Sequence, residues 1–148
     1  MKVEAILKAK GQRVVTVTAE TPLAMVAHKL RRERIGALPV SPDGTHVVGI
    51  ISERDIVWGL AEHGPEILDW PTSRLMTHPV KTCRPADTIK SVMAEMTRSR
   101  LRHLPVVEDG RLAGIVSIGD VVKNRLDELE MEAAVMRDAY LGAAAKFG

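Results

Sequence analysis

The chain has 148 residues, which is enough for one compact domain or for two small units that share a core. Its formal net charge of +2 is too small to indicate nucleic acid as a main partner, and a lone cysteine, Cys83, excludes an internal disulfide and a thiolate metal cluster. Apolar residues make up 45% of the chain and aromatic residues only 3%, so we expect an aliphatic core.

The sequence also argues against a membrane location. No apolar run approaches the roughly 20 residues that a helix needs to cross a bilayer. The first residues, "MKVEAILKAKGQ", contain an acidic residue and lack the apolar segment of a signal peptide. We therefore expect a soluble cytoplasmic protein with no membrane partner.

The first part of the chain predicts a helix followed by a β-α-β-β-α unit. The N-terminal helix ends at Gly11, a residue type that tolerates positive φ. The run "RVVTV" (13–17) predicts a short strand. The helix after it has one apolar face, formed by Leu23, Val26, Ala27 and Leu30. A strand at 38–40, an Asp-Gly turn at 43–44 and the run "VVGII" predict a hairpin, after which Ser52 begins another helix.

The second part repeats this order. The strand "PVKTC" (79–83) precedes a helix whose apolar face is Ile89, Val92, Met93 and Met96. "LPV" at 104–106, Asp-Gly at 109–110 and "LAGIV" predict a second hairpin, and Ser117 begins the next helix. A unit of about 60 residues buries little surface alone, so we expect the two copies to pack together.

The predicted fold is therefore α/β (α+β), with two β-α-β-β-α repeats related by a pseudo-two-fold axis. The first repeat is assigned to residues 1–62 and the second to 74–126. A linker covers 63–73, where Trp70 is expected to pack onto the body, and a helical tail covers 127–148. In the tail, alternating steps of four and three separate Val122, Leu126, Leu129, Ala133, Met136 and Tyr140. This heptad-like seam predicts either a cover for the chain's own core or a contact in a dimer.

The same junction closes both hairpins, as "GIISERDIV" (49–57) and "GIVSIGDVV" (114–122). Ser-x-x-Asp before an apolar run is typical of a helix capping box, and both copies could be nothing more. However, a glycine three residues before each serine leaves room for an approaching group. A helix N-terminus favours phosphate, and a nearby carboxylate can accept both hydroxyls of a ribose. Together these features indicate a nucleotide site.

These repeated motifs resemble a tandem pair of CBS (cystathionine β-synthase) domains, over about residues 2–125. The segments "SERD" and "RHLPV…SIGD" are similar to those of small stand-alone bacterial members. The resemblance implies two clefts between the copies, which bind adenosine-containing ligands such as AMP, ADP, ATP, NAD or S-adenosylmethionine. We accordingly expect a regulatory energy sensor that forms a homodimer, acts on a separate effector protein and requires no cofactor or metal.

The resemblance also implies which residues form the two clefts. One cleft would use Asp120 for the ribose, Ser117 near the phosphate, and Arg102 and His103 facing the phosphate. Its adenine would lie against the other copy, near Lys10, Gln12, Val14, Ile35, Gly36 and Ala37. The second cleft would use Asp55, Ser52, Arg54, Thr77, Val80 and the stretch 101–103 that begins at Leu101. Because Arg102 and His103 suit phosphate better than Gly36 and Ala37, we expect the Asp120 cleft to fill first.

Three other functions are disfavoured by the sequence. An enzyme is not expected, since no histidine lies four residues from another and no H-E-x-x-H, Walker or G-x-G-x-x-G pattern occurs. A pure interaction module with empty clefts is the main alternative, but both ribose aspartates are present. Nucleic-acid binding through "RRER" and "RSRLR" would lack aromatic residues to stack bases.

Overall fold

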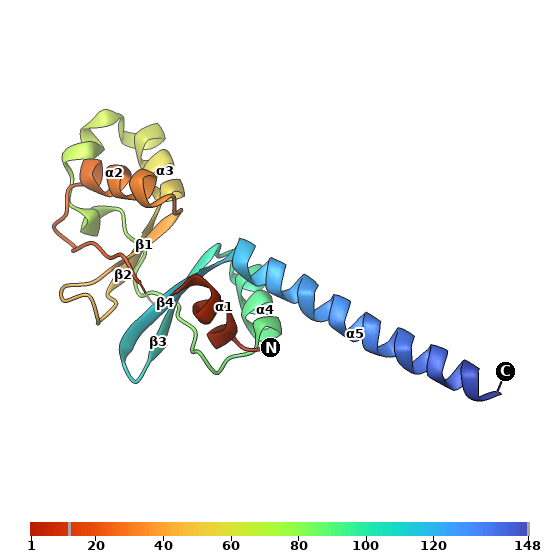
Figure 1. Cartoon of the computed structure of the whole chain (residues 1–148). Coiled ribbons are helices and arrows are strands. Elements are labelled where there is room, and N and C mark those ends of the chain that lie inside the picture. Colours follow the sequence, from red (N-terminus) through yellow and green to blue (C-terminus); the bar gives the residue numbers. More distant parts are fainter. Residues whose placement is uncertain (12, 148) are drawn as a thin grey trace.

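The computed structural model describes residues 1–11 and 13–147 and contains two similar halves and a long C-terminal helix (Figure 1). The first half comprises α2 (Leu23–Glu33), β1 (Ala37–Val40), β2 (Gly49–Ser52) and α3 (Glu53–His63). The second comprises α4 (Ile89–Ser99), β3 (His103–Glu108), β4 (Arg111–Ser117) and the start of α5 (Ile118–Phe147). Helix α1 (Val3–Lys10) precedes both halves, and the linker holds the 3-10 helices η1 (Pro65–Asp69) and η2 (Thr72–Arg74). The predicted mixed fold of two repeats with a C-terminal helix is confirmed.

The two hairpins form two small antiparallel sheets, β1–β2 and β3–β4. Asp109 and Gly110 both have positive φ, 52° and 76°, as a type I′ turn of two residues requires. The first hairpin has a longer loop, in which the Asp43 carboxylate accepts the backbone N–H groups of Thr45 and His46. These hydrogen bonds hold the pKa of Asp43 well below its ordinary value.

The predicted opening strands are reduced to one parallel bridge each. Val17 pairs with Val40, and Cys83 pairs with Val106. Each opening segment thus runs parallel to the first strand of its hairpin, but the two are joined by a single bridge. Val17 N–H donates to the Pro39 carbonyl at 3.2 Å, and Cys83 N–H donates to the Pro105 carbonyl at 3.0 Å. The next bond of either ladder would need an amide hydrogen on that same proline, which proline lacks. The "LPV" motif therefore ends each ladder.

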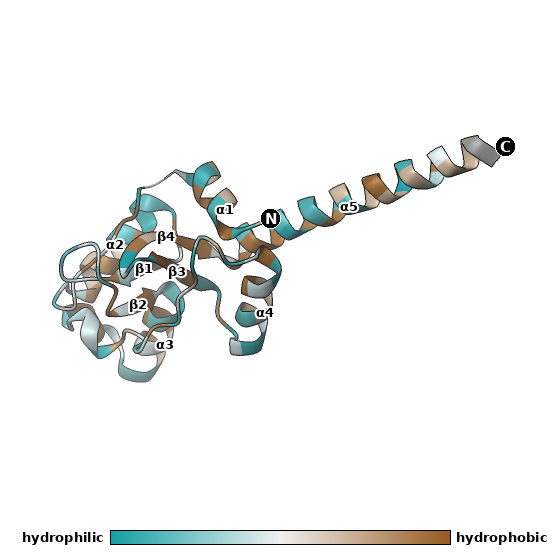
Figure 2. Cartoon of the chain, turned by 90° about the horizontal axis from the view of Figure 1, so that it is seen from below, coloured by the Kyte–Doolittle hydropathy of each residue, from teal (hydrophilic) through white to brown (hydrophobic). Residues whose placement is uncertain are grey.

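Each half has its own aliphatic core, and the predicted helix faces lie in them. The first core contains Val17, Leu23, Val26, Leu30, Leu38, Val40, Ile51, Ile56 and Ile67, with Ala27 and Trp70 packed against it. The second contains Val3, Ile6, Cys83, Ile89, Val92, Met96, Leu104, Val106, Val116 and Val121, with Met93 at its edge. In Figure 2 the strands between the helices are mostly coloured as hydrophobic. The apolar periodicity of both helices is confirmed.

Helix α1 completes the second core, although it precedes the first repeat in the chain. Its residues Val3 and Ile6 are buried there. The Ile89 N–H at the start of α4 donates to the Met1 carbonyl at 3.1 Å, and Val3 N–H donates to the Asp87 carbonyl at 2.9 Å. A division of the sequence at residue 62 thus groups α1 with the first repeat. In space, however, α1 completes the core of the second repeat.

The linker completes the first core through backbone hydrogen bonds at the equivalent positions of the first repeat. Leu23 N–H donates to the Trp70 carbonyl at 3.0 Å, and Thr72 N–H donates to the Thr21 carbonyl at 2.9 Å. Antiparallel bridges repeat as well, between residues 22 and 71 and between 2 and 88. Each repeat is therefore closed by the segment that precedes the other repeat.

The glycine of the repeated junction lets side chains of these exchanged segments pack closely against the strand. A Cβ on Gly49 would lie 2.7 Å from the Met76 sulfur, and one on Gly114 would lie 2.5 Å from Leu7 Cδ2. The space that the sequence suggested for a ligand is thus filled by the protein's own side chains at both positions. These glycines serve the packing between repeats.

Within the described residues, no helix is both long enough and apolar enough to cross a membrane.

We predict that Gly114→Ala lowers the free energy of unfolding by about 1–3 kcal/mol, because the new methyl group displaces Leu7 from the α1–β4 contact. Gly119→Ala is the matched control. Its Cβ would meet nothing closer than the Ser117 hydroxyl at 3.6 Å, so the helix gains or keeps stability. Urea unfolding of the two variants checks this, and equal stabilities would contradict it.

Candidate functional site

Helix α3 begins with a complete capping box made by Ser52 and Asp55. The Asp55 N–H donates to Ser52 Oγ at 3.2 Å, and Asp55 Oδ2 accepts both the N–H and the hydroxyl of Ser52 at 2.9 Å. The structural role of the motif is therefore present. Among the described residues, no hydrogen bond engages Asp55 Oδ1, so this oxygen can still accept a donor from outside the chain.

Helix α5 begins with the same arrangement, but its aspartate carries an additional partner. Asp120 Oδ2 accepts the Ser117 N–H at 2.9 Å and also the Lys10 ammonium at 2.7 Å. Lys10 donates in addition to the Ile115 carbonyl at 3.2 Å. Burial acts to raise the pKa of Asp120, but the bonds from Lys10 and Ser117 outweigh it and hold this pKa below its ordinary value. The Asp120 carboxylate is thus neutralised by the end of α1.

A cavity of about 170 Å³ lies beside Asp55, between the two repeats. The first repeat contributes Gly36, Ala37, Ile50, Ser52, Glu53, Arg54 and Asp55, and the second repeat contributes Thr77, Arg100, Leu101, Arg102 and His103. Three arginines therefore line one small space that is also lined by a carboxylate residue, Asp55. Arginine forks are well suited to phosphate oxygens.

A second cavity of about 320 Å³ shares Ile50, Thr77, Leu101 and His103 with the first. Its remaining lining is Pro79, Val80, Lys81 and Ser99. The two cavities form one cleft, which is cationic at the Arg102 end and more apolar at the Val80 end. Such a cleft offers separate places for a charged group and for a flat apolar one.

His103 stands at the wall between the repeats. Its Cε1 atom would lie 3.0 Å from a Cβ on Gly36, so a side chain at position 36 would require the imidazole to shift. Burial lowers the pKa of His103, and the charges of Lys10 and Arg102 act in the same direction, whereas Glu53 and Asp120 act against it. The imidazole is therefore disposed to be neutral until an anion enters the cleft.

The structure brings together most of the residues that the resemblance assigned to the Asp55 cleft. Arg102 and His103, assigned to phosphate in the Asp120 cleft, also line the Asp55 cleft, as do Gly36 and Ala37. The other residues assigned to the adenine of the Asp120 cleft are more dispersed. Ile35 lines a different cavity between α2 and α3, and the Lys10 ammonium is bonded to Asp120. Val14 is half-buried, and Gln12 falls outside the described residues.

Arg100 was missed by the sequence reasoning. It follows α4 with φ of 54°, and the corresponding Arg34 follows α2 with φ of 55°. An arginine at the same place in both repeats was the available signal. Among the described residues, no group of three or more histidine, cysteine or acidic side chains is arranged to hold a metal ion.

Both repeats match a known protein family. A family model described as CBS domain matches residues 10–62 and 73–127. The crystal structure of a CBS-domain containing protein from Agrobacterium tumefaciens is 42% identical, covers 84% of this chain and 99% of its own, and superposes with a TM-score of 0.81.

Two further neighbours were solved with ligands. A CBS domain protein from Pyrobaculum aerophilum complexed with AMP is 26% identical, covers 90% of this chain and 99% of its own, and has a TM-score of 0.77. A CBS domain pair in complex with 5-methylthioadenosine and S-adenosyl-L-methionine is 25% identical, covers 86% of this chain and 98% of its own, and has a TM-score of 0.76.

We predict that the stability of the protein falls at acidic pH partly through His103. Its pKa is lower in the folded than in the unfolded chain, so protonation favours unfolding. The contribution of the neutral His103 to the free energy of unfolding is complete above pH 6.5, the ordinary pKa. It is lost as the pH falls from there toward the lowered pKa of the folded chain. Urea unfolding at pH 7.5 and 5.5 should show a smaller pH dependence for His103→Gln than for the unchanged protein; an identical dependence would refute this role.

Proposed function

Because the chain belongs to the CBS domain family and carries two copies of the domain, we propose that it is a non-catalytic regulatory module that binds an adenosine-containing nucleotide beside Asp55. The observation that carries this proposal is the cleft itself. A carboxylate with an uncommitted oxygen lies between a group of three arginines and an apolar end formed with Val80.

Each part of a nucleotide has a counterpart in this cleft. The ribose hydroxyls donate to Asp55 Oδ1, and the phosphates lie among Arg54, Arg100 and Arg102 at the start of α3, where the helix dipole adds to their charge. The adenine lies toward Val80 and Ile50. The complexes of the two neighbours with AMP and with 5-methylthioadenosine and S-adenosyl-L-methionine support an adenosine ligand.

The Asp55 cleft is the preferred site over the Asp120 cleft. At Asp120 a ligand would share the carboxylate with the Lys10 ammonium, which lies 2.7 Å from Oδ2. The preference of the sequence for Asp120 rested on Arg102 and His103, and these residues line the Asp55 cleft too. We therefore propose that the Asp55 cleft fills first, which is the reverse of the order expected from the sequence.

Regulation follows from a shift between conformations. Phosphate draws together arginines from both repeats, Arg54 from α3 and Arg100 and Arg102 from the segment after α4. A ligand that binds the closed arrangement more tightly increases its population and so changes the surface that an effector protein meets. The alternative is an interaction module whose clefts have no physiological nucleotide.

Calorimetric titration with AMP, ATP, NAD and S-adenosylmethionine tests the proposal. We predict that Asp55→Ala weakens the best ligand by roughly ten- to a hundredfold, as expected for the loss of hydrogen bonds to a charged group. Asp120→Ala is the matched control, because it removes the same capping carboxylate from the other repeat and should leave this affinity within about threefold. If none of the four ligands binds below millimolar, the interaction module is the better description; if Asp120→Ala alone loses binding, the site is the other cleft.

Tryptophan fluorescence offers an independent measurement. The Arg54 guanidinium lies 5.5 Å from the Trp58 ring, so movement of Arg54 toward phosphate changes the surroundings of this indole. We predict a saturable change in emission on adding ligand, which Trp58→Phe abolishes. Trp70→Phe should retain it, because Trp70 stacks on Arg74 in the linker. A signal that depends on Trp70 instead would contradict this arrangement.

A further inference from the structure

The outer part of α5 carries an apolar face that the rest of the chain does not cover. The helix leaves the body and projects away from it (Figure 1). Along this part, hydrophobic and hydrophilic residues alternate in Figure 2. The predicted seam is exposed from its second member onward, with Leu126 at 56%, Leu129 at 44%, Met136 at 73% and Tyr140 at 74%. The interpretation that the seam covers the chain's own core is therefore wrong for this part of the helix.

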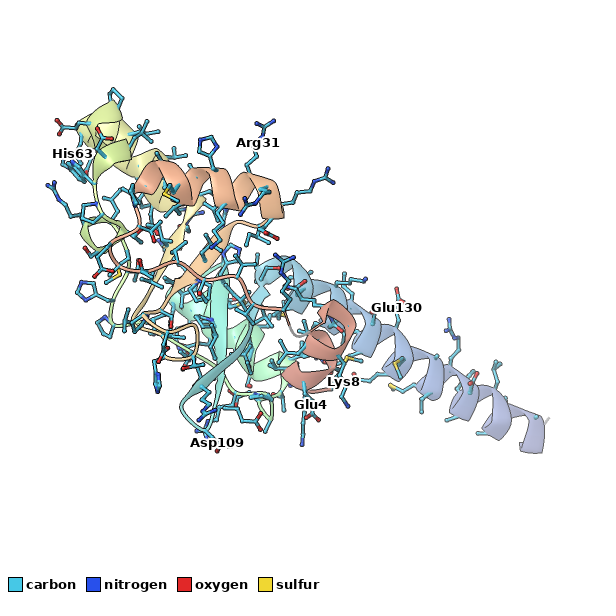
Figure 3. The ribbon with its side chains drawn as sticks, turned by 60° about the vertical axis from the view of Figure 1, so that its left-hand side comes forward. Glu4, Lys8, Arg31, His63, Asp109 and Glu130 are labelled. Carbon is cyan, nitrogen blue, oxygen red and sulfur yellow. The ribbon has the colours of Figure 1, made fainter. Side chains whose placement is uncertain are left out.

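The helix packs on its own body through a different stripe. Val121 is buried in the second core, and Glu128, one heptad later, lies 3.8 Å from the N-terminal amine of Met1 and is only 14% exposed. In Figure 3, α1, marked by Glu4 and Lys8, lies near the start of α5. In heptad terms these two residues occupy position c, whereas the seam occupies positions a and d. The body and the seam are thus on different faces.

We propose that the seam pairs with the seam of a second copy of this chain, as a parallel two-stranded coiled coil. The spacing places Leu126, Ala133 and Tyr140 at a and Val122, Leu129 and Met136 at d. A surface with the same pattern on both partners meets itself across a two-fold axis.

The charges beside the seam favour this partner. Glu130, Glu132 and Arg137 have no residue of opposite charge three or four positions away in the helix. Among the described residues, neither Glu130 nor Arg137 makes an ion pair within the single chain, and Glu130 projects from the free part of α5 in Figure 3. The charges of Glu130 and Arg137 remain available to a second helix, whereas Glu132 lies 4.0 Å from Arg125 of its own chain.

A parallel alignment pairs these charges at both flanking positions. In such a coiled coil each g residue faces the e residue five positions later on the other helix. Arg125 then faces Glu130 of the second copy, and Glu132 faces Arg137 of the second copy. An antiparallel alignment that brings Glu130 to Arg137 leaves Glu132 beside Ala139. Since Arg125 bonds Glu128 at 3.2 Å and approaches Glu132 only to 4.0 Å, the pair between Glu132 and Arg137 provides the sharper test.

Cysteine cross-linking of the full chain tests the alignment. In the parallel pair, Tyr140→Cys places two thiols side by side and forms a disulfide-linked dimer under mild oxidation. Asp138→Cys, at the outer f position, is the matched control and should not cross-link. The native Cys83 does not interfere, because burial raises the pKa of its thiol to about 12. Absence of the Tyr140→Cys cross-link, or equal cross-linking of both variants, would overturn the proposal.

Charge reversal in the Tyr140→Cys background tests the register. Arg137→Glu turns two ion pairs per dimer into repulsions and should slow cross-linking roughly tenfold. Adding Glu132→Arg should restore the rate, whereas adding Glu130→Arg should not. Rescue by Glu130→Arg, or no effect of Arg137→Glu, would overturn the parallel register. The readout is independent of nucleotide, so failure here and failure of the proposed function are distinguishable.

Discussion

The exchange of closing segments between the repeats is the constraint on which the rest of the structure depends. The first residues of the chain complete the core of the second repeat, and the linker completes the core of the first. Equivalent backbone hydrogen bonds do this in both places: the Ile89 N–H donates to the Met1 carbonyl, and the Leu23 N–H donates to the Trp70 carbonyl. Neither repeat has a finished core without the other, and this explains how units of about 60 residues can be stable together.

The exchange also makes the two clefts unequal. The segment that closes the second core is a helix that continues to Lys10, whose ammonium reaches Asp120. The segment that closes the first core is extended after η2 and pairs with β2 through the backbone of Thr77 and Ile50. Among the described residues, no cation forms an ion pair with Asp55. A repeated motif can therefore carry an ion-paired aspartate in one copy and one without such a pair in the other.

Much of this architecture is predictable from sequence because it depends on local patterns. The faces of α2 and α4, the hairpins and the capping of α3 and α5 follow from residue spacing and from residues such as Gly110 and Ser52. The shortened parallel ladders could also have been anticipated, since Pro39 and Pro105 are visible in the sequence. The predicted division into repeats placed α1 with the repeat that follows it, because sequence order says nothing of which core a helix enters.

The site was harder to predict than the fold. Asp55 and Ser52 could be identified because the motif occurs twice. The contact of Lys10 with Asp120 joins residues far apart in the chain, and it depends on the exchanged helix. Arg100 lines the cleft from a position with a left-handed backbone conformation, φ of 54°. Arginine rarely adopts this conformation, so the sequence does not predict it there. Long-range placement thus decides which of two similar motifs has an ion pair on its aspartate.

Helix α5 joins two distant parts of the molecule through one uninterrupted element of 30 residues. Its first turn carries Asp120, and its far end lies roughly 45 Å away at the usual rise per residue. Such a helix can act as a lever that pivots about its packed first turns, where Val121 is buried in the second core. A change of tilt of about 5° at the pivot moves the far end by roughly 4 Å, close to the rise of three residues. Small rearrangements between the repeats are thereby magnified into displacements comparable to the spacing of successive layers in a coiled coil.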